Sequence, residues 1–191
     1  MVRYMGDTIL SISIIGNNIN LSDISKFSKR YEIEFINNFC LDNPPKGLII
    51  SEKLNSRTKI FVKSALKNKI PILAYEKGFT ALVENSINKP VKKNNDQSDY
   101  LFLSPGAKIS HIIGGSGWIK TNFLPSRELK LENLPESFFG SIISKTGNII
   151  AYERSGHVWI FGISWDIFDS MHLPKGFNKI FTVFIDKCYN N

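Results

Sequence analysis

Residues 70–79 read IPILAYEKGF, an apolar run that is followed by a charged pair and a glycine. Short apolar runs of this kind are typical of strands that are buried on both faces of a sheet. Beyond Gly78, apolar residues recur at helical spacing through Val83. We therefore expect a strand at 70–73, a connection at 74–78, and a helix immediately after it.

The same alternation extends through the rest of the chain. The other predicted strands are short and apolar, and they lie at 9–15, 32–35, 48–50, 141–144, 149–153 and 158–163. The other predicted helices are amphipathic, and they lie at 22–31, 56–68 and 179–189. A polar loop is expected at 85–99, and strands joined by tight turns at 100–123. Early strands that alternate with helices indicate a parallel, doubly wound α/β sheet, and residues 1–191 are predicted to form a single domain.

The composition places the chain among ordinary globular proteins. Its 191 residues are 42% hydrophobic and 21% charged, which is enough apolar material for a core without a disulfide or a metal. With only Cys40 and Cys188, a disulfide framework, a four-cysteine zinc site and an iron–sulfur cluster are excluded. The histidines His111, His157 and His172 are scattered, so we expect no metal and no other cofactor. No apolar run approaches the ~20 residues that cross a bilayer, so we expect no membrane association and a cytoplasmic location.

The positive charge of the chain is concentrated in one region. The formal net charge is +7, and most of the excess lies between residues 51 and 100. Lys59, Lys63 and Lys67 are spaced by four residues and form one stripe of the helix predicted at 56–68, with Ile60 and Val62 expected on the opposite, apolar face. The stripe is either an ordinary solvated face or a patch for phosphate, nucleic acid or an acidic partner.

Several segments, in their linear order, resemble the class I glutamine amidotransferase family, and most closely the glutaminase domain of GMP synthases. The segments are short and together span nearly the whole chain: GLIIS at 47–51, IPILAYEKGF at 70–79, GWIK at 117–120, LPESF at 134–138, WIFGISW at 159–165, and the tail at 176–188. The resemblance implies a flavodoxin-like three-layer α/β sandwich with a mostly parallel central sheet. It also implies that residues 70–79 hold the strand and the sharp turn that carry the family's nucleophile.

The catalytic residues of that family are missing at the matching positions. In the family, a cysteine at the turn attacks the side-chain amide of glutamine, a histidine activates the cysteine, and a glutamate orients the histidine. The resemblance puts Glu76 in the place of the cysteine, Asp166 in that of the histidine, and Phe168 in that of the glutamate. Glu52 and Lys53 replace the glycine pair whose backbone helps to form the oxyanion hole.

No other residue is expected to replace the missing nucleophile. Cys40 precedes Pro44 in a loop, and Cys188 lies in the closing helix, so neither thiol is predicted at a strand-to-helix turn. His172 follows Asp166 in the sequence, and we expect it to be an ordinary exposed or hydrogen-bonded histidine.

Glu76 has two interpretations. As an altered general base or a ligand-binding acid, it would share a pocket with Asp166, Tyr75, Lys77 and Gly78, and backbone N–H groups and Lys77 would hold its carboxylate ionised. As a structural residue, it would only cap the following helix after catalysis was lost. The second interpretation is favoured because no activated nucleophile or base replaces the missing histidine.

The sequence therefore predicts a catalytically inactive glutamine amidotransferase-like protein, a pseudoenzyme with a binding, scaffolding or regulatory role. By resemblance, its partner would be a synthetase-like subunit or a second copy of the chain. Two alternatives stay open. One is an enzyme that uses Glu76 and Asp166 on a small substrate, and the other is a basic protein that binds nucleic acid or ribosomes through Lys59, Lys63 and Lys67.

Overall fold

The computed structural model describes residues 9–16, 32–36, 40, 42–87, 92–93, 100–121, 127–156, 158–168 and 173–191. The helix predicted at 22–31, most of the loop predicted at 85–99, and the histidines His157 and His172 lie outside the described residues. Within the described part, no helix is both long and apolar enough to span a membrane.

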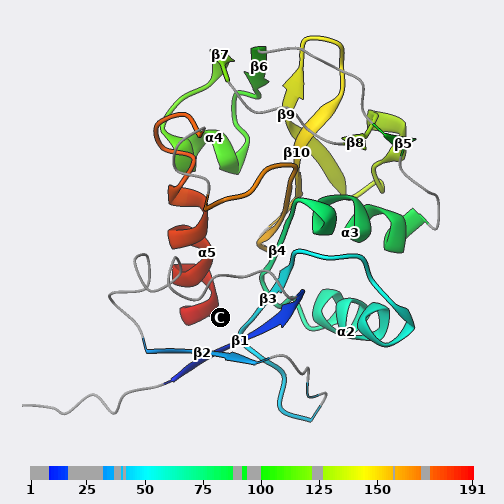
Figure 1. The fold of residues 1–191 in the computed structure, drawn as a ribbon. Helices are drawn as coiled ribbons and strands as arrows, with labels where there is room; N and C mark the ends of the chain where they lie inside the picture. Colours follow the sequence, from blue (N-terminus) through cyan, green and yellow to red (C-terminus); the bar gives the residue numbers. More distant parts are fainter. Residues whose placement is uncertain are drawn as a thin grey trace, which may run out of the picture.

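A nine-stranded sheet forms the centre of the molecule, with the strand order β2-β1-β3-β4-β11-β10-β9-β6-β7 (Figure 1). Its strands are β1 (Leu10–Ile15), β2 (Ile33–Ile36), β3 (Gly47–Ile50), β4 (Ile72–Tyr75), β6 (Tyr100–Leu103), β7 (Gly117–Lys120), β9 (Phe138–Ser144), β10 (Ile149–Arg154) and β11 (Ile160–Ile163). The first five strands in this order pair in parallel, and the others extend the sheet by antiparallel pairing. β5 (Lys92–Lys93) and β8 (Arg127–Glu128) form a separate antiparallel pair.

Helices cover both faces of this sheet, so the molecule is a three-layer α/β sandwich (Figure 1). α2 (Ser56–Lys67) and α3 (Lys77–Ile87) lie on one face, and α4 (Lys108–Ile113) and α5 (Lys179–Tyr189) lie on the other. A short 3-10 helix, η1, spans Leu131–Asn133.

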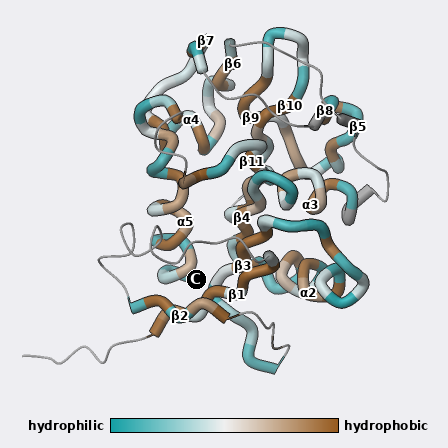
Figure 2. The backbone as a smooth tube through the Cα atoms, in the orientation of Figure 1, coloured by the Kyte–Doolittle hydropathy of each residue, from teal (hydrophilic) through white to brown (hydrophobic). Residues whose placement is uncertain are grey.

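Alternate residues of each central strand divide between the two faces, as the two-residue period of a strand requires. In β4, Ile72 and Ala74 pack in the core that includes α2 and α3, whereas Leu73 and Tyr75 pack in the core that includes α5. Figure 2 shows hydrophobic residues along these central strands. Because both faces of β4 are buried, the strand is apolar throughout, which is the pattern that made it recognisable in the sequence.

The structure corrects the predicted bounds of β4. The strand spans Ile72–Tyr75 rather than 70–73, because Ile70 belongs to the C-terminal cap of α2. The Ile70 N–H donates to the Ala65 carbonyl oxygen at 3.0 Å, and the Lys69 N–H to that of Leu66 at 3.4 Å. This pair of hydrogen bonds is a Schellman motif, which ends the helix before the strand begins.

Two other elements also differ from the prediction. The region 100–123 contains α4 as well as two strands, and α3 continues to Ile87, into the predicted loop. Ile60 is 56% exposed and is not part of the apolar face of α2. It lies about 200° around the helix from Val62, which is fully buried, so the two side chains cannot share a face.

Candidate functional site

Glu76 is the single residue between β4 and α3, so it occupies a sharp strand-to-helix turn. Its backbone is left-handed, with φ of 49°, and its N–H donates to the Ile163 carbonyl oxygen of β11 at 3.1 Å. Among the described non-glycine residues, only Glu76 and Lys69 have positive φ. A left-handed residue that carries a Cβ costs about 1–2 kcal/mol, so the surrounding fold maintains a strained residue at this turn.

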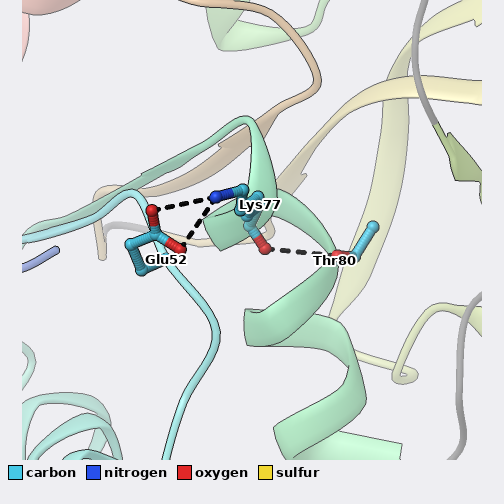
Figure 3. A network of polar contacts seen from close by, with 3 residues as sticks. All are labelled: Glu52, Lys77 and Thr80. Atoms are coloured by element: carbon cyan, nitrogen blue, oxygen red, sulfur yellow. Dashed lines mark hydrogen bonds and ion pairs between the residues drawn. The ribbon is translucent and has the colours of Figure 1, made fainter. Parts of the chain in front are cut away.

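The helix that follows Glu76 starts in direct contact with the backbone of β3. A Cβ on Gly78 would collide with the Ile50 carbonyl oxygen, so glycine is needed for this close approach. The Thr80 hydroxyl is buried and donates to the Lys77 carbonyl oxygen at 3.2 Å (Figure 3). The turn and the first residues of α3 are therefore fixed against the sheet, and so is the position of Glu76.

Lys77 and Glu52 form an ion pair across the ends of β3 and β4 (Figure 3). Lys77 Nζ lies 3.0 Å from Glu52 Oε1 and 3.2 Å from Oε2, which ties the loop after β3 to the start of α3. The Lys77 side chain is 58% exposed, so solvent screens the pair and its contribution to stability is about 0–1 kcal/mol. Lys77 was expected to hold the Glu76 carboxylate ionised. Its charge does lower the pKa of Glu76, but its ammonium group bonds directly to Glu52.

Glu52, Glu76 and Asp166 bring negative charge together around this turn. Glu76 is exposed, but partial desolvation of its carboxyl group raises its pKa, and repulsion from Asp166 raises the pKa further. Lys77 opposes this shift and Glu52 adds to it. Burial also raises the pKa of Tyr75, which is 2% exposed, and Asp166 acts in the same direction. The Tyr75 phenol therefore stays protonated at neutral pH.

The described residues contain no group of three His, Cys, Asp or Glu side chains that could hold a metal ion.

Asp166 and Phe168 lie in the turn after β11, the strand next to β4. The Phe168 N–H donates to Asp166 Oδ1 at 2.9 Å, which fixes the aspartate in a local turn. The Phe168 ring packs edge-on against Tyr75, with ring centroids 6.1 Å apart, and against Phe181 of α5 at 5.1 Å. The position that the resemblance assigns to a glutamate is thus part of an aromatic cluster and offers no acceptor that would orient a histidine.

Glu52 and Lys53 follow β3 and line a cavity of about 430 Å³ at the carboxyl ends of β1 and β3. Gly16, Asn55 and Thr58 form part of its wall. β2 and β3 pair with opposite edges of β1, so the strand order reverses between β1 and β3. The cavity therefore lies at the topological switch point of the sheet, where open α/β folds bind ligands. Glycine after β1 predicted only a turn, so the sequence did not reveal this cavity.

Neither described cysteine is at the turn that holds Glu76. Cys188 is fully buried in α5, where a Cβ on Gly47 would meet its sulfur, and burial raises the pKa of its thiol. Gly47 begins β3, whereas Glu76 follows the carboxyl end of the parallel strand β4, so Cys188 lies at the opposite edge of the sheet from Glu76. Cys40 is exposed in the segment that leads into β3, and His111 is exposed on α4.

The lysine stripe of α2 lies open to solvent. Lys59, Lys63 and Lys67 are all exposed, and Arg57 extends over the Phe61 ring, 5.6 Å from its centroid. The stripe is on the outer side of the helix and does not join the cluster around Glu76.

No protein-family model and no curated protein matches the sequence. The structure is similar to solved structures, among them a GMP synthase subunit-like protein from Thermoplasma acidophilum, with a TM-score of 0.68 and 16% identity over 96% of each chain. The chain has a class I glutamine amidotransferase-like fold. A glutamine amidotransferase from Thermotoga maritima is similar with a TM-score of 0.61 and 11% identity, over 84% of this chain and 76% of its own. One from Methylobacillus flagellatus has a TM-score of 0.60 and 9% identity, over 83% of this chain and 70% of its own.

The glutamine amidotransferase-like fold gives Glu76 a defined setting. β4, Glu76 and α3 supply the strand, turn and helix that the sequence resemblance implies for a nucleophile, and Glu76 is the residue at the turn. Asp166 and Phe168 follow the neighbouring strand β11, and Glu52 and Lys53 follow β3 on the other side. The positions singled out in the sequence thus gather at one edge of the sheet.

Replacing Glu76 with glutamine is expected to stabilise the protein slightly at neutral pH. Because the pKa of Glu76 is raised in the folded state, the free energy of unfolding falls as pH rises from about 4.5 through the folded pKa. Glu76→Gln removes this loss, and we expect a gain of a few tenths of a kcal/mol at pH 7, since the side chain is exposed. The gain should disappear below pH 4, where the wild-type glutamate is protonated and, like the glutamine of the variant, carries no charge.

The comparison uses urea unfolding of both proteins at a series of pH values. Glu136→Gln, at an exposed glutamate in the turn before β9, serves as the matched control and should show no such pH-dependent gain. An equal gain in the control, or a loss of stability in Glu76→Gln at pH 7, would contradict the electrostatic account of the cluster.

Proposed function

We propose that this protein does not hydrolyse glutamine and that it acts as a binding or regulatory member of the glutamine amidotransferase-like group. One observation carries the proposal: a carboxylate, and not a thiol, stands at the strained turn between β4 and α3. A carboxylate at this position has no means of forming the thioester through which a cysteine glutaminase releases ammonia.

The charge around the turn supports the same proposal. Cysteine chemistry needs an environment that favours a thiolate and then a negatively charged oxygen. Here Asp166 and Glu52 both act on position 76 in the sense that disfavours a negative charge. The change therefore extends beyond one missing atom to the electrostatics of the whole turn.

Binding to another protein is the role that the remaining features support. The similar structure from Thermoplasma acidophilum is named as a synthase subunit, so a chain of this architecture has a precedent as part of an assembly. We propose a synthetase-like subunit or a second copy of this chain as the partner, and a cytoplasmic location. The exposed lysines of α2 provide a basic surface for an acidic partner or for nucleic acid, whose binding would weaken steeply with rising salt.

A second candidate function rests on the pair Glu76 and Asp166. Desolvation and then repulsion from Asp166 raise the pKa of Glu76, and a raised pKa suits a carboxylate to acid–base work. Strained residues such as Glu76 also cluster at functional sites. Turnover of a small substrate that is lost in Glu76→Gln, while folding is retained, would favour this candidate over the inactive one.

The proposal is tested by measuring ammonia release from glutamine by the purified chain, first alone and then together with a synthetase and its nucleotide substrates. We expect no release above the rate without protein, under conditions in which a cysteine-dependent glutaminase is active. Release that exceeds this background and disappears in Cys40→Ser or Cys188→Ser would overturn the proposal, because it would show that one of these thiols acts as a nucleophile.

A further inference from the structure

Lys69 is the second strained residue, and it lies far from Glu76 in the fold. Its φ is 57°, at the position of the Schellman motif of α2 where glycine is usual and asparagine is tolerated. Lysine, unlike glycine, pays the full energetic cost of this left-handed backbone conformation. Strained residues that persist are enriched at functional positions, so the surroundings of Lys69 are the place to search for a ligand.

Lys69 lines a cavity of about 420 Å³ at the amino ends of β4 and β11. Pro71, Val158 and Trp159 provide an apolar wall, and Lys187, Asn190 and Asn191, at the end of α5, provide a polar one. The volume is within the range of small-molecule sites, which combine an apolar wall with a few polar groups. The cavity is at the opposite edge of the sheet from Glu76, so it is separate from the candidate site around that residue.

The wall is preorganised by the strands and by the end of α5. The Ile72 N–H donates to the Trp159 carbonyl oxygen at 2.9 Å, which holds the starts of β4 and β11 together. The Trp159 side chain is 5% exposed and stacks on Phe161 and Phe184, with ring centroids at 4.2 and 5.4 Å. Asn190 closes α5 by donating its amide to the Asp186 carbonyl oxygen at 2.7 Å.

Two lysines line the cavity. Lys69 and Lys187 are both exposed, neither has an ion-pair partner within the described part of the chain, and the described lining contains no aspartate or glutamate. Lys46 Nζ donates to the Asn191 backbone oxygen at 3.2 Å, which holds the segment after α5 beside the start of β3.

We propose that this cavity binds a small phosphorylated molecule, with Lys69 and Lys187 on the phosphoryl group and the wall formed by Pro71, Val158 and Trp159 against its less polar part. The two ammonium groups supply charge-assisted hydrogen bonds to phosphoryl oxygens. The asparagine side chains accept or donate hydrogen bonds to hydroxyl or amide groups of the same ligand. The need to place an ammonium group at the mouth of the cavity accounts for a lysine in a left-handed conformation.

The full chain is titrated with inorganic pyrophosphate, and binding is measured by isothermal titration calorimetry and by tryptophan fluorescence. We expect saturable binding at one site. The double variant Lys69→Asn/Lys187→Gln should bind about tenfold or more weakly, the loss expected for charge-assisted hydrogen bonds. Asparagine is chosen at position 69 because it tolerates the left-handed backbone, so the variant should stay folded.

Two controls locate the binding. Lys59→Gln/Lys63→Gln removes two charges from the exposed face of α2 and should leave the affinity unchanged within about twofold. Trp159→Phe should lose the fluorescence change, because Trp159 is the tryptophan that lines the cavity. The proposal is overturned if pyrophosphate shows no saturable binding, if the α2 variant weakens binding as much as the cavity variant, or if the fluorescence change survives in Trp159→Phe.

Discussion

Replacing Gly78 with alanine is expected to lower the free energy of unfolding by about 3 kcal/mol, and the melting temperature by about 6–12 °C. In an ordinary helix the same change would stabilise the protein by nearly 1 kcal/mol, because alanine is the better helix former. Here the new Cβ would meet the Ile50 carbonyl oxygen, and a strand backbone at the centre of a sheet cannot move aside. The stability change expected here is opposite in sign to the change expected in an ordinary helix, so the measurement shows directly whether α3 contacts the backbone of β3.

Gly115→Ala is the matched control for this variant. Gly115 lies in the connection between α4 and β7, and a Cβ there would have no neighbouring atom within 4 Å. Its free energy of unfolding, measured in urea, should change by no more than about 0.5 kcal/mol. A Gly78→Ala protein that is as stable as the wild type would mean that α3 does not start against the backbone of β3, and the position assigned to Glu76 would then fail as well.

Glu153→Ala is expected to cost a similar amount, about 3 kcal/mol, for a different reason. Glu153 is fully buried on β10, and its two carboxylate oxygens accept the Lys108 N–H at 2.8 Å and the Ile109 N–H at 3.1 Å. These N–H groups begin α4 and have no partner within the helix. Removing the carboxylate leaves one buried and one partly buried donor unsatisfied, at about 1–3 kcal/mol for a buried donor before relaxation.

Hydrogen exchange distinguishes this loss from general destabilisation. In Glu153→Ala, the amides of Lys108 and Ile109 should lose protection before those of the central strands β3 and β4. Glu136→Ala, at an exposed glutamate, should leave both the protection pattern and the stability unchanged. Uniform loss of protection across the sheet would argue against a local cap at α4.

The elements that the sequence predicts well are those whose pattern is local. The apolar run at 70–79 identified the strand and helix around Glu76, because a strand buried on both faces is apolar at every position. Periodic apolar residues likewise predicted α5 with the observed bounds, Lys179–Tyr189. The candidate residues around Glu76 were found through the family resemblance, because residues from three separate strand ends come together only in the fold.

What the sequence does not predict depends on contacts between distant residues. α4 has six residues and gains its N-terminal partners from Glu153, 45 positions after Lys108, so no local capping signal announces it. The left-handed Lys69 occupies a position where glycine or asparagine would signal the end of a helix. The cavity that it lines joins the starts of two strands to the end of α5, a juxtaposition that only the sheet order creates.

The most direct test of the central claim is to treat the protein with an electrophilic glutamine analogue and to measure its intact mass. Such a reagent alkylates a cysteine that is activated to attack glutamine. We predict that the mass stays unchanged at concentrations that fully label a cysteine-dependent glutaminase, since position 76 carries a carboxylate and Cys188 is buried at the other edge of the sheet. Stoichiometric labelling that maps to Cys40 or Cys188, and that glutamine prevents, would contradict the account.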